Sequence, residues 1–412
     1  MSYFKEKIIS FFLKDYTVIN SYFPISKLDV FDYFKKRLLL RQYKTNDSFC
    51  VNFIITSKAE IRVFTPLLNY IVEYNPEIKV KLFFAKKGVG FDSNLLQKIY
   101  DSKTIKIEHS ALSLTEYENA INVICLDHNY YKNAHKIGVD IVTFLNSKKQ
   151  ATVCVQHGGN QKDYINGHLS SISKYQLLFG RLIYNRFVEF GFSAKNLFLT
   201  GNPLHDKAFR KNLKLIFDAK RKVISLITCV HTEYDDRSNP RESYIQYVKT
   251  VFESINYEEY VLVIKMHPYD PVEDNIYDFV RMELGLTESD IRIIGANDTS
   301  KTVYDVIKAS SLVISRASSV IEESLMLKKR VVAFDLYEDG ASKHYDFLLK
   351  YDIYKKVIKD SKRLALAIRE LESSIISDFE IDEIIGNTTY KLDGKSTERI
   401  MMALKSISIF NK

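Results

Sequence analysis

The sequence predicts an α/β protein built from two doubly wound domains, each a parallel sheet covered by helices on both faces. The first observation is that short apolar runs of strand length alternate with longer stretches of helical pattern. The second is that the runs at 261–264 and 312–314 are continuously apolar, as in strands buried in a parallel sheet. A length of 412 residues and a hydrophobic content of 46% suit two or three domains with sizeable cores.

The first domain is expected at residues 49–205. The apolar run 49–55 predicts its first strand, and a loop at 56–60 leads into a helix through Leu67, Leu68 and Ile71. The later strands of this domain are predicted at 79–84, 121–126, 152–156 and 197–200. The last of them ends at Gly201-Asn202-Pro203, a turn-rich exit from the sheet.

The second domain is expected at residues 223–385, after a basic linker at 206–222. Its strands are predicted at 223–227, 261–264, 291–294, 312–314 and 331–334. The terminal segment 386–412 contains a helical pattern at 396–408, which we expect to pack back on the first domain. Two doubly wound domains that face each other would form a central cleft from the carboxyl ends of both sheets.

The first 48 residues are interpreted as a basic amphipathic extension. Lysines and arginines alternate there with phenylalanines, isoleucines and leucines, and the whole chain has a net charge of +8. Such a segment can bind an anionic membrane surface; the alternative is a helix packed on the core with its lysines in solvent. Nucleic acid is not an expected partner, because acidic residues are interspersed along the rest of the chain and no nucleic-acid module is recognised.

The cysteines indicate a reducing compartment. The chain has four of them, widely separated and without the spacing of a metal site or a disulfide framework: Cys50, Cys125, Cys154 and Cys229. No cleavable signal peptide and no apolar run long enough to cross a bilayer is recognised. The sequence therefore predicts a cytoplasmic protein, with peripheral attachment at the inner face of the cell membrane as the alternative.

Two polar clusters follow predicted strands of the second domain. Lys265, His267 and Pro268 follow one strand, and Ser318 and Ser319 follow another. Because ligands collect where parallel strands end, this arrangement predicts a socket for the phosphate of a nucleotide-activated substrate.

A helix is expected to begin after Ser319. The Ser319-x-x-Glu322 spacing has the form of a capping box, and unpaired N–H groups at the helix start could bind phosphate. Capping alone would also account for these two residues.

The order of these motifs resembles the GT-B glycosyltransferases and the related UDP-N-acetylglucosamine 2-epimerases over roughly residues 50–340. The Thr-Ser-Lys-Ala-Glu loop at 56–60 and the Thr-Gly-Asn-Pro turn at 200–203 look like elements of both groups. The resemblance implies two Rossmann-like domains.

Within that superfamily, the Lys-x-His-Pro and Ser-Ser motifs are similar to those of bacterial sialyl-, polysialyl- and Kdo-transferases and teichoic-acid glycerophosphotransferases. The Gln-His-Gly-Gly segment 156–159 also resembles an element of the capsule and teichoic-acid enzymes. The resemblance implies that His267, Ser318 and Ser319 hold the phosphate of a cytidine nucleotide and that Glu323 grips its ribose. Each of these residues also has a purely structural alternative, such as a helix carboxylate in solvent for Glu323.

The general base for an acceptor hydroxyl is expected in the first domain. Glu60 is the leading candidate, since the Kdo transferases that this chain resembles carry a glutamate in the same loop. Asp127 and His157 are the alternatives, and each of the three could instead be a cap or a loop-fixing residue. Lys58 and Arg316 are predicted to meet an anionic sugar, unless they are surface cations. No metal and no cofactor are expected.

The sequence thus favours a glycosyltransferase that moves Kdo or a sialic-acid-like sugar from a CMP donor onto a surface glycan or glycolipid acceptor. One alternative is an epimerase, because Asp127 follows a strand as that family's catalytic aspartate does. Against it, segment 156–159 lacks the glutamate of the epimerases, and about fifty residues precede the first strand. A CDP-glycerol-type glycerophosphotransferase and a non-catalytic membrane-peripheral scaffold are the remaining alternatives.

Overall fold

The structure is a computed structural model. It describes residues 49–85, 97–99, 101–102, 104–108, 114–115, 117, 119–128, 135–206, 217, 220–229, 240–267, 275–296, 298, 300–337 and 341–410. The predicted N-terminal extension 1–48, most of the predicted linker and Pro268 lie outside these residues. Among the described helices, none is long and apolar enough to cross a membrane.

The chain divides into two compact units. The first takes the described residues within Met1–His157, Tyr164–Lys207 and Thr389–Lys412, and the second those within Gly158–Asp163 and Ala208–Thr388. The chain therefore passes from one unit to the other four times, and a short loop from the first half of the sequence belongs to the second unit.

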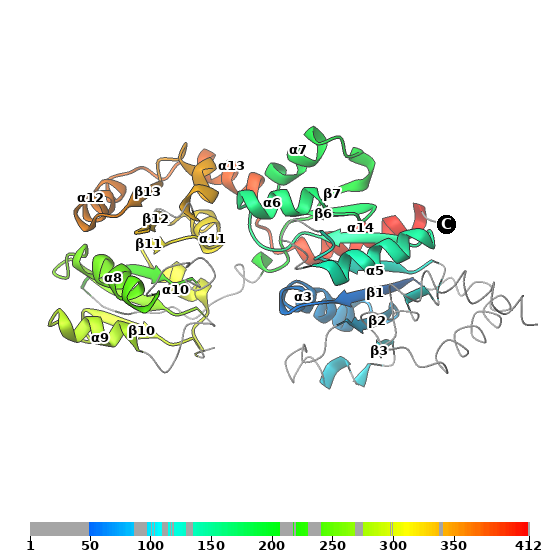
Figure 1. Cartoon of the computed structure of the whole chain (residues 1–412), viewed down its shortest axis with the longest axis horizontal. Helices are drawn as coiled ribbons and strands as arrows, with labels where there is room; N and C mark the ends of the chain where they lie inside the picture. The colour runs from blue at the N-terminus through cyan, green and yellow to red at the C-terminus, as the bar shows by residue number, and fades with distance from the viewer. Residues whose placement is uncertain are drawn as a thin grey trace, which may run out of the picture. The chain divides into compact units, whose positions relative to one another are not determined.

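The first unit is built on a parallel seven-stranded sheet of order β3-β2-β1-β4-β5-β6-β7 (Figure 1). Its strands are β1 (Cys50–Ile55), β2 (Lys79–Phe84), β3 (Ile105–Glu108), β4 (Ile121–Ile124), β5 (Ala151–Val155), β6 (Tyr175–Leu178) and β7 (Leu197–Leu199). The helices are α3 (Lys58–Tyr74), α5 (Lys136–Ser147), α6 (Lys162–Leu169), α7 (Arg181–Glu189) and α14 (Ser396–Phe410), with a 3₁₀ turn η2 (Ala194–Asn196).

Alternate residues of β1 enter two different cores, which shows that helices cover both faces of this sheet. Phe53 packs with α3 and α14, whereas its neighbour Ile54 packs with α5. Both side chains are fully buried, as the continuous apolar run predicted.

The second unit has a parallel six-stranded sheet of order β10-β9-β8-β11-β12-β13. Its strands are β8 (Lys222–Ile227), β9 (Tyr260–Lys265), β10 (Ile291–Ile294), β11 (Leu312–Ser315), β12 (Arg330–Asp335) and β13 (Tyr354–Ile358). Its helices are α8 (Pro240–Glu253), α9 (Ile276–Glu283), α10 (Val303–Ala309), α11 (Val320–Met326), α12 (Ser361–Glu372) and α13 (Asp378–Thr388), with a 3₁₀ segment η5 (Ala341–Leu348). The predicted fold class, two doubly wound parallel sheets, is confirmed.

Strand order reverses once in each sheet, and the point of reversal determines where a ligand-binding crevice can form. In the first unit β1 lies between β2 and β4, and in the second β8 lies between β9 and β11. The connections on the two sides of such a point leave in opposite directions and open a crevice beyond the strand ends. The candidate site residues lie after β1, β4 and β5 in the first unit and at the ends of β9 and β11 in the second.

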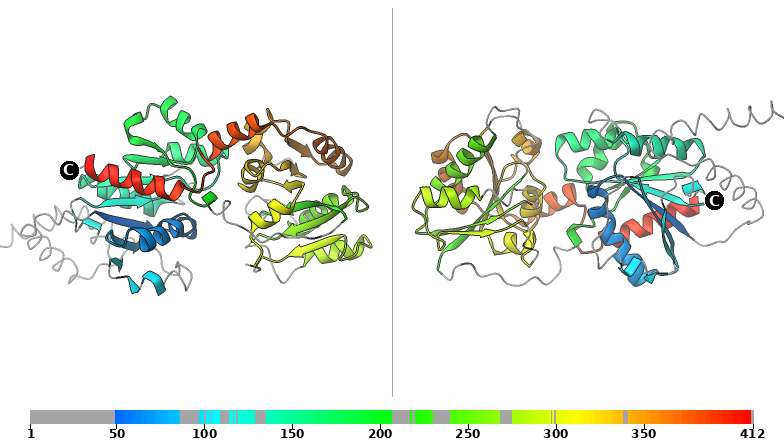
Figure 2. Two further views of the ribbon diagram at one scale, coloured as in Figure 1. Left: turned by 180° about the vertical axis from the view of Figure 1, so that it is seen from behind. Right: turned by 60° about the horizontal axis from the view of Figure 1, so that its bottom comes forward.

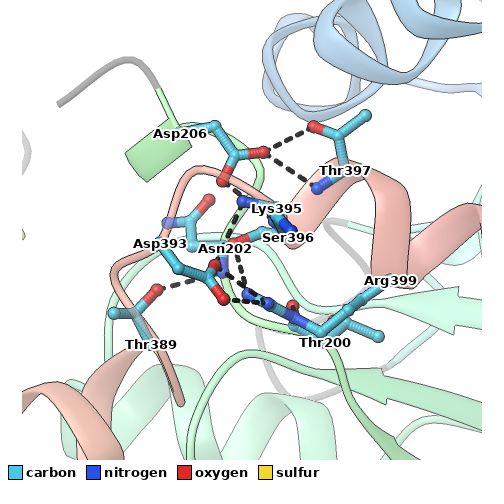
Figure 3. Close-up of polar contacts among 9 residues, drawn as sticks. All are labelled: Thr200, Asn202, Asp206, Thr389, Asp393, Lys395, Ser396, Thr397 and Arg399. Carbon is cyan, nitrogen blue, oxygen red and sulfur yellow. Dashed lines mark hydrogen bonds and ion pairs between the residues drawn. The ribbon is translucent and has the colours of Figure 1, made fainter. Parts of the chain in front are cut away.

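The terminal helix α14 lies against α3 on one face of the first sheet (Figure 2). Its start is capped from a distant turn: Asp206 accepts hydrogen bonds from Ser396 N (2.9 Å), Thr397 N (2.9 Å) and Thr397 Oγ1 (2.8 Å) (Figure 3). Arg399 donates to Thr200 O (2.7 Å). The Thr-Gly-Asn-Pro turn is thus the anchor of the C-terminal segment.

Gly201, in this turn, cannot be replaced without strain. Its φ is +80°, and an added Cβ would lie 2.6 Å from Ser396 Oγ and 2.8 Å from Thr389 O. Gly191 offers a matched control, because its φ is +93° but nothing lies within 4 Å of an added Cβ. We expect Gly191→Ala to cost about 1–2 kcal/mol of unfolding free energy for the backbone alone, and Gly201→Ala about 1–3 kcal/mol more. Chemical denaturation would measure both, and equal losses would contradict the packing argument.

Candidate active site

The candidate site residues of the first unit lie beyond the ends of β1, β4 and β5. Glu60 belongs to the first turn of α3, Asp127 and His128 follow β4, and His157 follows β5. These strands are neighbours in the sheet, so their polar ends meet at one edge.

Glu60 is fully buried and caps the first turn of α3. It forms a capping box with Ser57, and its Oε2 accepts hydrogen bonds from Thr56 Oγ1 (2.8 Å) and Ser57 N (3.0 Å). Its Oε1 accepts from Cys125 N (3.2 Å), which joins the β1 loop to the end of β4. Burial raises the pKa of Glu60 to about 7, against the lowering effect of these donors. Both oxygens are occupied by main-chain and side-chain donors.

Replacement of Glu60 by Gln should cost stability. The amide group of Gln would have to face a main-chain N–H that now donates to a carboxylate oxygen, at a cost of about 1–3 kcal/mol. The folded pKa of about 7 lies above the ordinary glutamate value of 4.5, so the contribution of Glu60 is complete below about pH 4.5 and is lost as the pH rises through 7. The deficit of Glu60→Gln in urea unfolding should therefore be larger at pH 5 than at pH 8. Glu73→Gln, at an exposed position of α3, should change stability by no more than about 1 kcal/mol.

Asp127 is fully buried, and one of its oxygens is firmly held. Oδ2 accepts hydrogen bonds from Ser171 Oγ (2.9 Å), Ser173 N (2.8 Å) and Ser173 Oγ (2.6 Å). Gln176 donates in turn to Ser171 Oγ (2.9 Å). Oδ1 has no hydrogen-bond partner among the described residues.

Four histidines of the first unit lie close together. The ring centroids of His128 and His135 are 4.7 Å apart, and those of His157 and His168 are 4.9 Å apart. The two pairs are linked by centroid distances of 5.9 Å (His128–His168) and 6.2 Å (His128–His157). His128 and His168 are 1% exposed, whereas His135 and His157 are half-buried.

Burial makes these histidines weak bases. It lowers the pKa of all four, that of His128 to about 3, while the Asp127 carboxylate opposes the shift at His135 and His168. All four imidazoles are therefore neutral at pH 7. Within the described ranges, no group of three or more His, Cys, Asp or Glu residues is arranged to hold a metal ion.

Sequence reasoning singled out only His157 and Asp127 of this cluster. His128 directly follows Asp127, and His168 lies eleven residues beyond His157 in the last turn of α6, where it contacts the His157 carbonyl oxygen at 3.0 Å. The signal available was the concentration of four of the chain's nine histidines within residues 128–168.

In the second unit, hydrogen bonds to neighbouring loops fix His267 and Lys265, two of the residues predicted to bind the nucleotide donor. The main-chain N–H of His267 donates to Thr228 Oγ1 (2.7 Å), and the His267 ring is half-buried. Lys265 is 9% exposed and donates to Gly295 O (3.2 Å) and Asp298 O (2.9 Å). Burial lowers the pKa of Lys265. The ammonium group of Lys265 thus joins the end of β9 to the loop after β10.

The predicted capping box at α11 is wrong. Ser319 has helical backbone angles (φ −54°, ψ −20°) and makes no side-chain cap, because an N-cap side chain reaches back only from extended backbone. Its hydroxyl instead lies 3.4 Å from Glu323 Oε1. Ser318, Ser319 and Glu323 are half-buried and adjoin one another at the start of α11.

Glu322 does not cap α11 but binds the loop Gly158–Asp163. It is 2% exposed, and its oxygens accept hydrogen bonds from Asn160 N and Asn160 Nδ2, both at 2.7 Å. A Cβ on Gly159 would lie 2.8 Å from Glu322 Oε1, so the close approach requires glycine. The sequence had indicated this loop only through its Gly-Gly pair.

The two cations predicted to meet an anionic sugar differ in placement. Lys58 is exposed in the first turn of α3. Arg316 is 1% exposed, with its Nε 3.6 Å from Asp335 Oδ1 and its guanidinium 4.7 Å from the ring centre of Tyr337. Among the described residues, Arg316 thus forms a buried ion pair with Asp335.

No family model matches the sequence, and no curated protein matches it. Several solved structures, however, match this chain in fold. A UDP-N-acetylglucosamine 2-epimerase from Listeria monocytogenes, designated putative, is 14% identical, with a TM-score of 0.59 over 87% of this chain and 96% of that one. The enzyme from Neisseria meningitidis, bound to UDP-GlcNAc, is 13% identical, with a TM-score of 0.54 over 87% and 100%. The wall teichoic acid polymerase TagF is 13% identical, with a TM-score of 0.53 over 96% and 98%.

The fold is GT-B. The predicted GT-B fold, and a likeness in fold to the epimerases, are confirmed by these structures. At such low identity the likeness concerns the fold alone.

Proposed function

We propose that this GT-B protein is an enzyme that transfers a group from a cytidine-nucleotide donor to an acceptor hydroxyl, with His157 as the general base. The observation that supports the proposal is the cluster of four neutral histidines beside the buried carboxylate of Asp127. A hydroxyl becomes a nucleophile only when a positioned base takes its proton, and a neutral imidazole is the usual base.

His157 is preferred over Glu60 and Asp127 for reasons of access. Glu60 and Asp127 are both fully buried, and each is hydrogen-bonded within the protein. His157 is half-buried at the end of β5, so a substrate can reach it. In the proposed step the acceptor O–H bond breaks, the proton goes to the imidazole, and the acceptor oxygen displaces the nucleotide.

The donor is assigned to the second unit. The hydroxyls of Ser318 and Ser319 and the His267 ring would bind the leaving phosphate, where fixed donors stabilise the charge that develops in the transition state. Glu323 would bind the ribose, with Lys265 supporting the loop. For the group transferred we retain Kdo or a sialic-acid-like sugar from a CMP donor, with a surface glycan or glycolipid as acceptor at the inner face of the membrane. Glycerol phosphate from CDP-glycerol is the alternative that shares this chemistry; the likeness to the polymerase TagF, which spans 96% of this chain, supports it.

A UDP-N-acetylglucosamine 2-epimerase is the second candidate. The epimerase structures have TM-scores of up to 0.59 with this chain. The carboxylate of Asp127 after β4 also favours it, since the resemblance in sequence implied an aspartate there. Against it stands the segment 156–159, which lacks the glutamate that the epimerases carry there.

A thermal-shift panel with CMP, CDP, UDP and UDP-N-acetylglucosamine tests the proposal. A nucleotide present at about 100 times its Kd stabilises the folded state by about 2.7 kcal/mol. We expect CMP or CDP to raise the unfolding midpoint, and Ser318→Ala with Ser319→Ala to abolish the shift. Ser373→Ala, at an exposed site of the same unit, should retain it. Stabilisation by UDP and its sugar alone would favour the epimerase, and no shift with any nucleotide would contradict both candidates.

A further inference from the structure

The short loop Gly158–Gln161 belongs to the second unit, although it follows β5 of the first. Asn160 holds it there. The main-chain N–H of Asn160 donates to Glu322 Oε1, and its Nδ2 donates to Glu322 Oε2, both at 2.7 Å. Asn160 Nδ2 also donates to Thr388 O at 3.2 Å. Both hydrogens of the Asn160 amide are therefore used, which fixes the orientation of this side chain.

The loop adjoins the proposed donor site through a glycine. Gly159 is buried, and a Cβ added to it would lie 2.8 Å from Glu322 Oε1 and 3.3 Å from Ser319 Cβ. The Ser319 hydroxyl lies 3.4 Å from Glu323 Oε1. Ser319 thus adjoins both the loop and Glu323, so a displacement of the loop would change the space in which the Ser319 side chain is held.

Glu322 makes the strongest of the contacts that hold this loop. Thr388 and Tyr345 also accept hydrogen bonds from it, but through a carbonyl oxygen and a hydroxyl. Glu322 accepts two through a carboxylate, and a hydrogen bond to an ionised acceptor is about twice as strong as one between neutral groups. Because Glu322 is 2% exposed, water does not readily replace these bonds when they are lost.

We propose that Glu322 is a positioning residue of the donor site: it holds the loop Gly158–Gln161 against α11, and the loop in turn fixes Ser319 for contact with the nucleotide phosphate. The inference rests on the proposed function, which assigns that phosphate to Ser318 and Ser319. Groups that contact a ligand must be held to within about 0.5 Å by the residues around them. Both oxygens of Glu322 are engaged by Asn160, so Glu322 acts through the loop and touches no ligand.

Glu322→Gln tests this role, because it keeps the shape but replaces one acceptor oxygen by an NH₂ group that would face a donor of Asn160. Isothermal titration calorimetry on the full chain would measure the Kd for CMP and CDP. We expect this Kd to rise by about 10–100-fold, the size of effect that a misplacement of about 1 Å can have. Glu258→Gln, at an exposed position of the same unit, should leave it unchanged.

Hydrogen exchange, followed by mass spectrometry, shows whether the loop is the link. In Glu322→Gln the peptide that contains Gly158–Gln161 should lose protection, whereas β9 (Tyr260–Lys265) should keep it. Glu322→Gln combined with Asn160→Asp should recover part of the protection and of the nucleotide affinity, because the new amide can donate to the new carboxylate. Recovery is partial, since Thr388 O loses its donor. Asn160→Asp alone brings two carboxylates together and should weaken binding as Glu322→Gln does.

Gly159→Ala keeps the test open if Glu322→Gln fails to fold. It changes no charge, and Gly159 does not have a positive φ, so the added Cβ is the only disturbance. This Cβ would push the loop away from Glu322 and Ser319, and we expect the same rise in Kd.

Unchanged nucleotide affinity in a folded Glu322→Gln or Gly159→Ala protein would overturn the inference and leave the proposed function intact. Weaker binding with full protection of the loop would also overturn it, because Glu322 would then act by another route. A native protein that binds no nucleotide would contradict the proposed function itself, and the inference with it. The native protein thus distinguishes the two failures.

Discussion

His157→Gln is expected to lower kcat for group transfer by about 10²–10⁴-fold, the usual contribution of a general base. Gln retains polarity and approximate size but cannot take up a proton. Since His157 is neutral at pH 7 in its buried surroundings, the native enzyme needs no deprotonation step before it acts. Steady-state rates at saturating donor and acceptor would measure the loss.

The control for this prediction separates chemistry from folding. His344→Gln changes a half-buried histidine of η5 in the second unit and should leave kcat within about twofold. Both variants should keep a native circular dichroism spectrum. A His157→Gln enzyme with near-normal kcat would return the base to Glu60 or Asp127, and Glu60→Gln and Asp127→Asn would then be compared under the same conditions.

The second large effect is expected at the buried ion pair of the second unit. Arg316 and Asp335 are each 1% exposed, so removal of either partner leaves an uncompensated charge inside the protein. Arg316→Met or Asp335→Leu should each lower the free energy of unfolding by about 3–5 kcal/mol. The double variant should recover most of this loss, because no charge then stays buried.

Urea unfolding of the two single variants and the double variant forms the required cycle. Lys328→Met provides the matched control, since the Lys328–Asp378 pair is exposed, with its side chains 58% and 83% accessible, and should be worth less than about 1 kcal/mol. Single-variant losses as small as that control would show that Arg316 is not held by Asp335. Arg316 would then be open to the anionic-sugar role.

Several of the strands that the sequence predicted share one property. Runs such as 50–55 and 260–265 are buried at every residue, and continuous burial produces a continuous apolar pattern. The missed strands lack this pattern. β3 and β13 lie at sheet edges and carry half-exposed polar residues, and β6 contains the buried Gln176. Gln176 is buried because it serves the loop that holds Asp127, which no local pattern indicates.

The sequence predicted which candidate residues lie at the ends of strands, but not which contacts they make. Because parallel strands bring their carboxyl ends to one edge, the residues after 55, 124, 265 and 315 were correctly placed at the ends of strands. The capping box was assigned to the wrong helix: the Ser-x-x-Glu spacing occurs at both 57–60 and 319–322, and only the first has the extended N-cap backbone that the motif requires.

The sequence by itself determined the class of fold, since apolar periodicity and strand-to-helix alternation depend on near neighbours in the chain. Only the tertiary structure decided which polar groups meet. Glu322 binds Asn160 across 162 positions of sequence, and four histidines from the loops after β4 and β5, the start of α5 and the end of α6 lie together. A buried polar group needs a partner wherever the fold provides one, and loop paths that no local pattern specifies determine where that is.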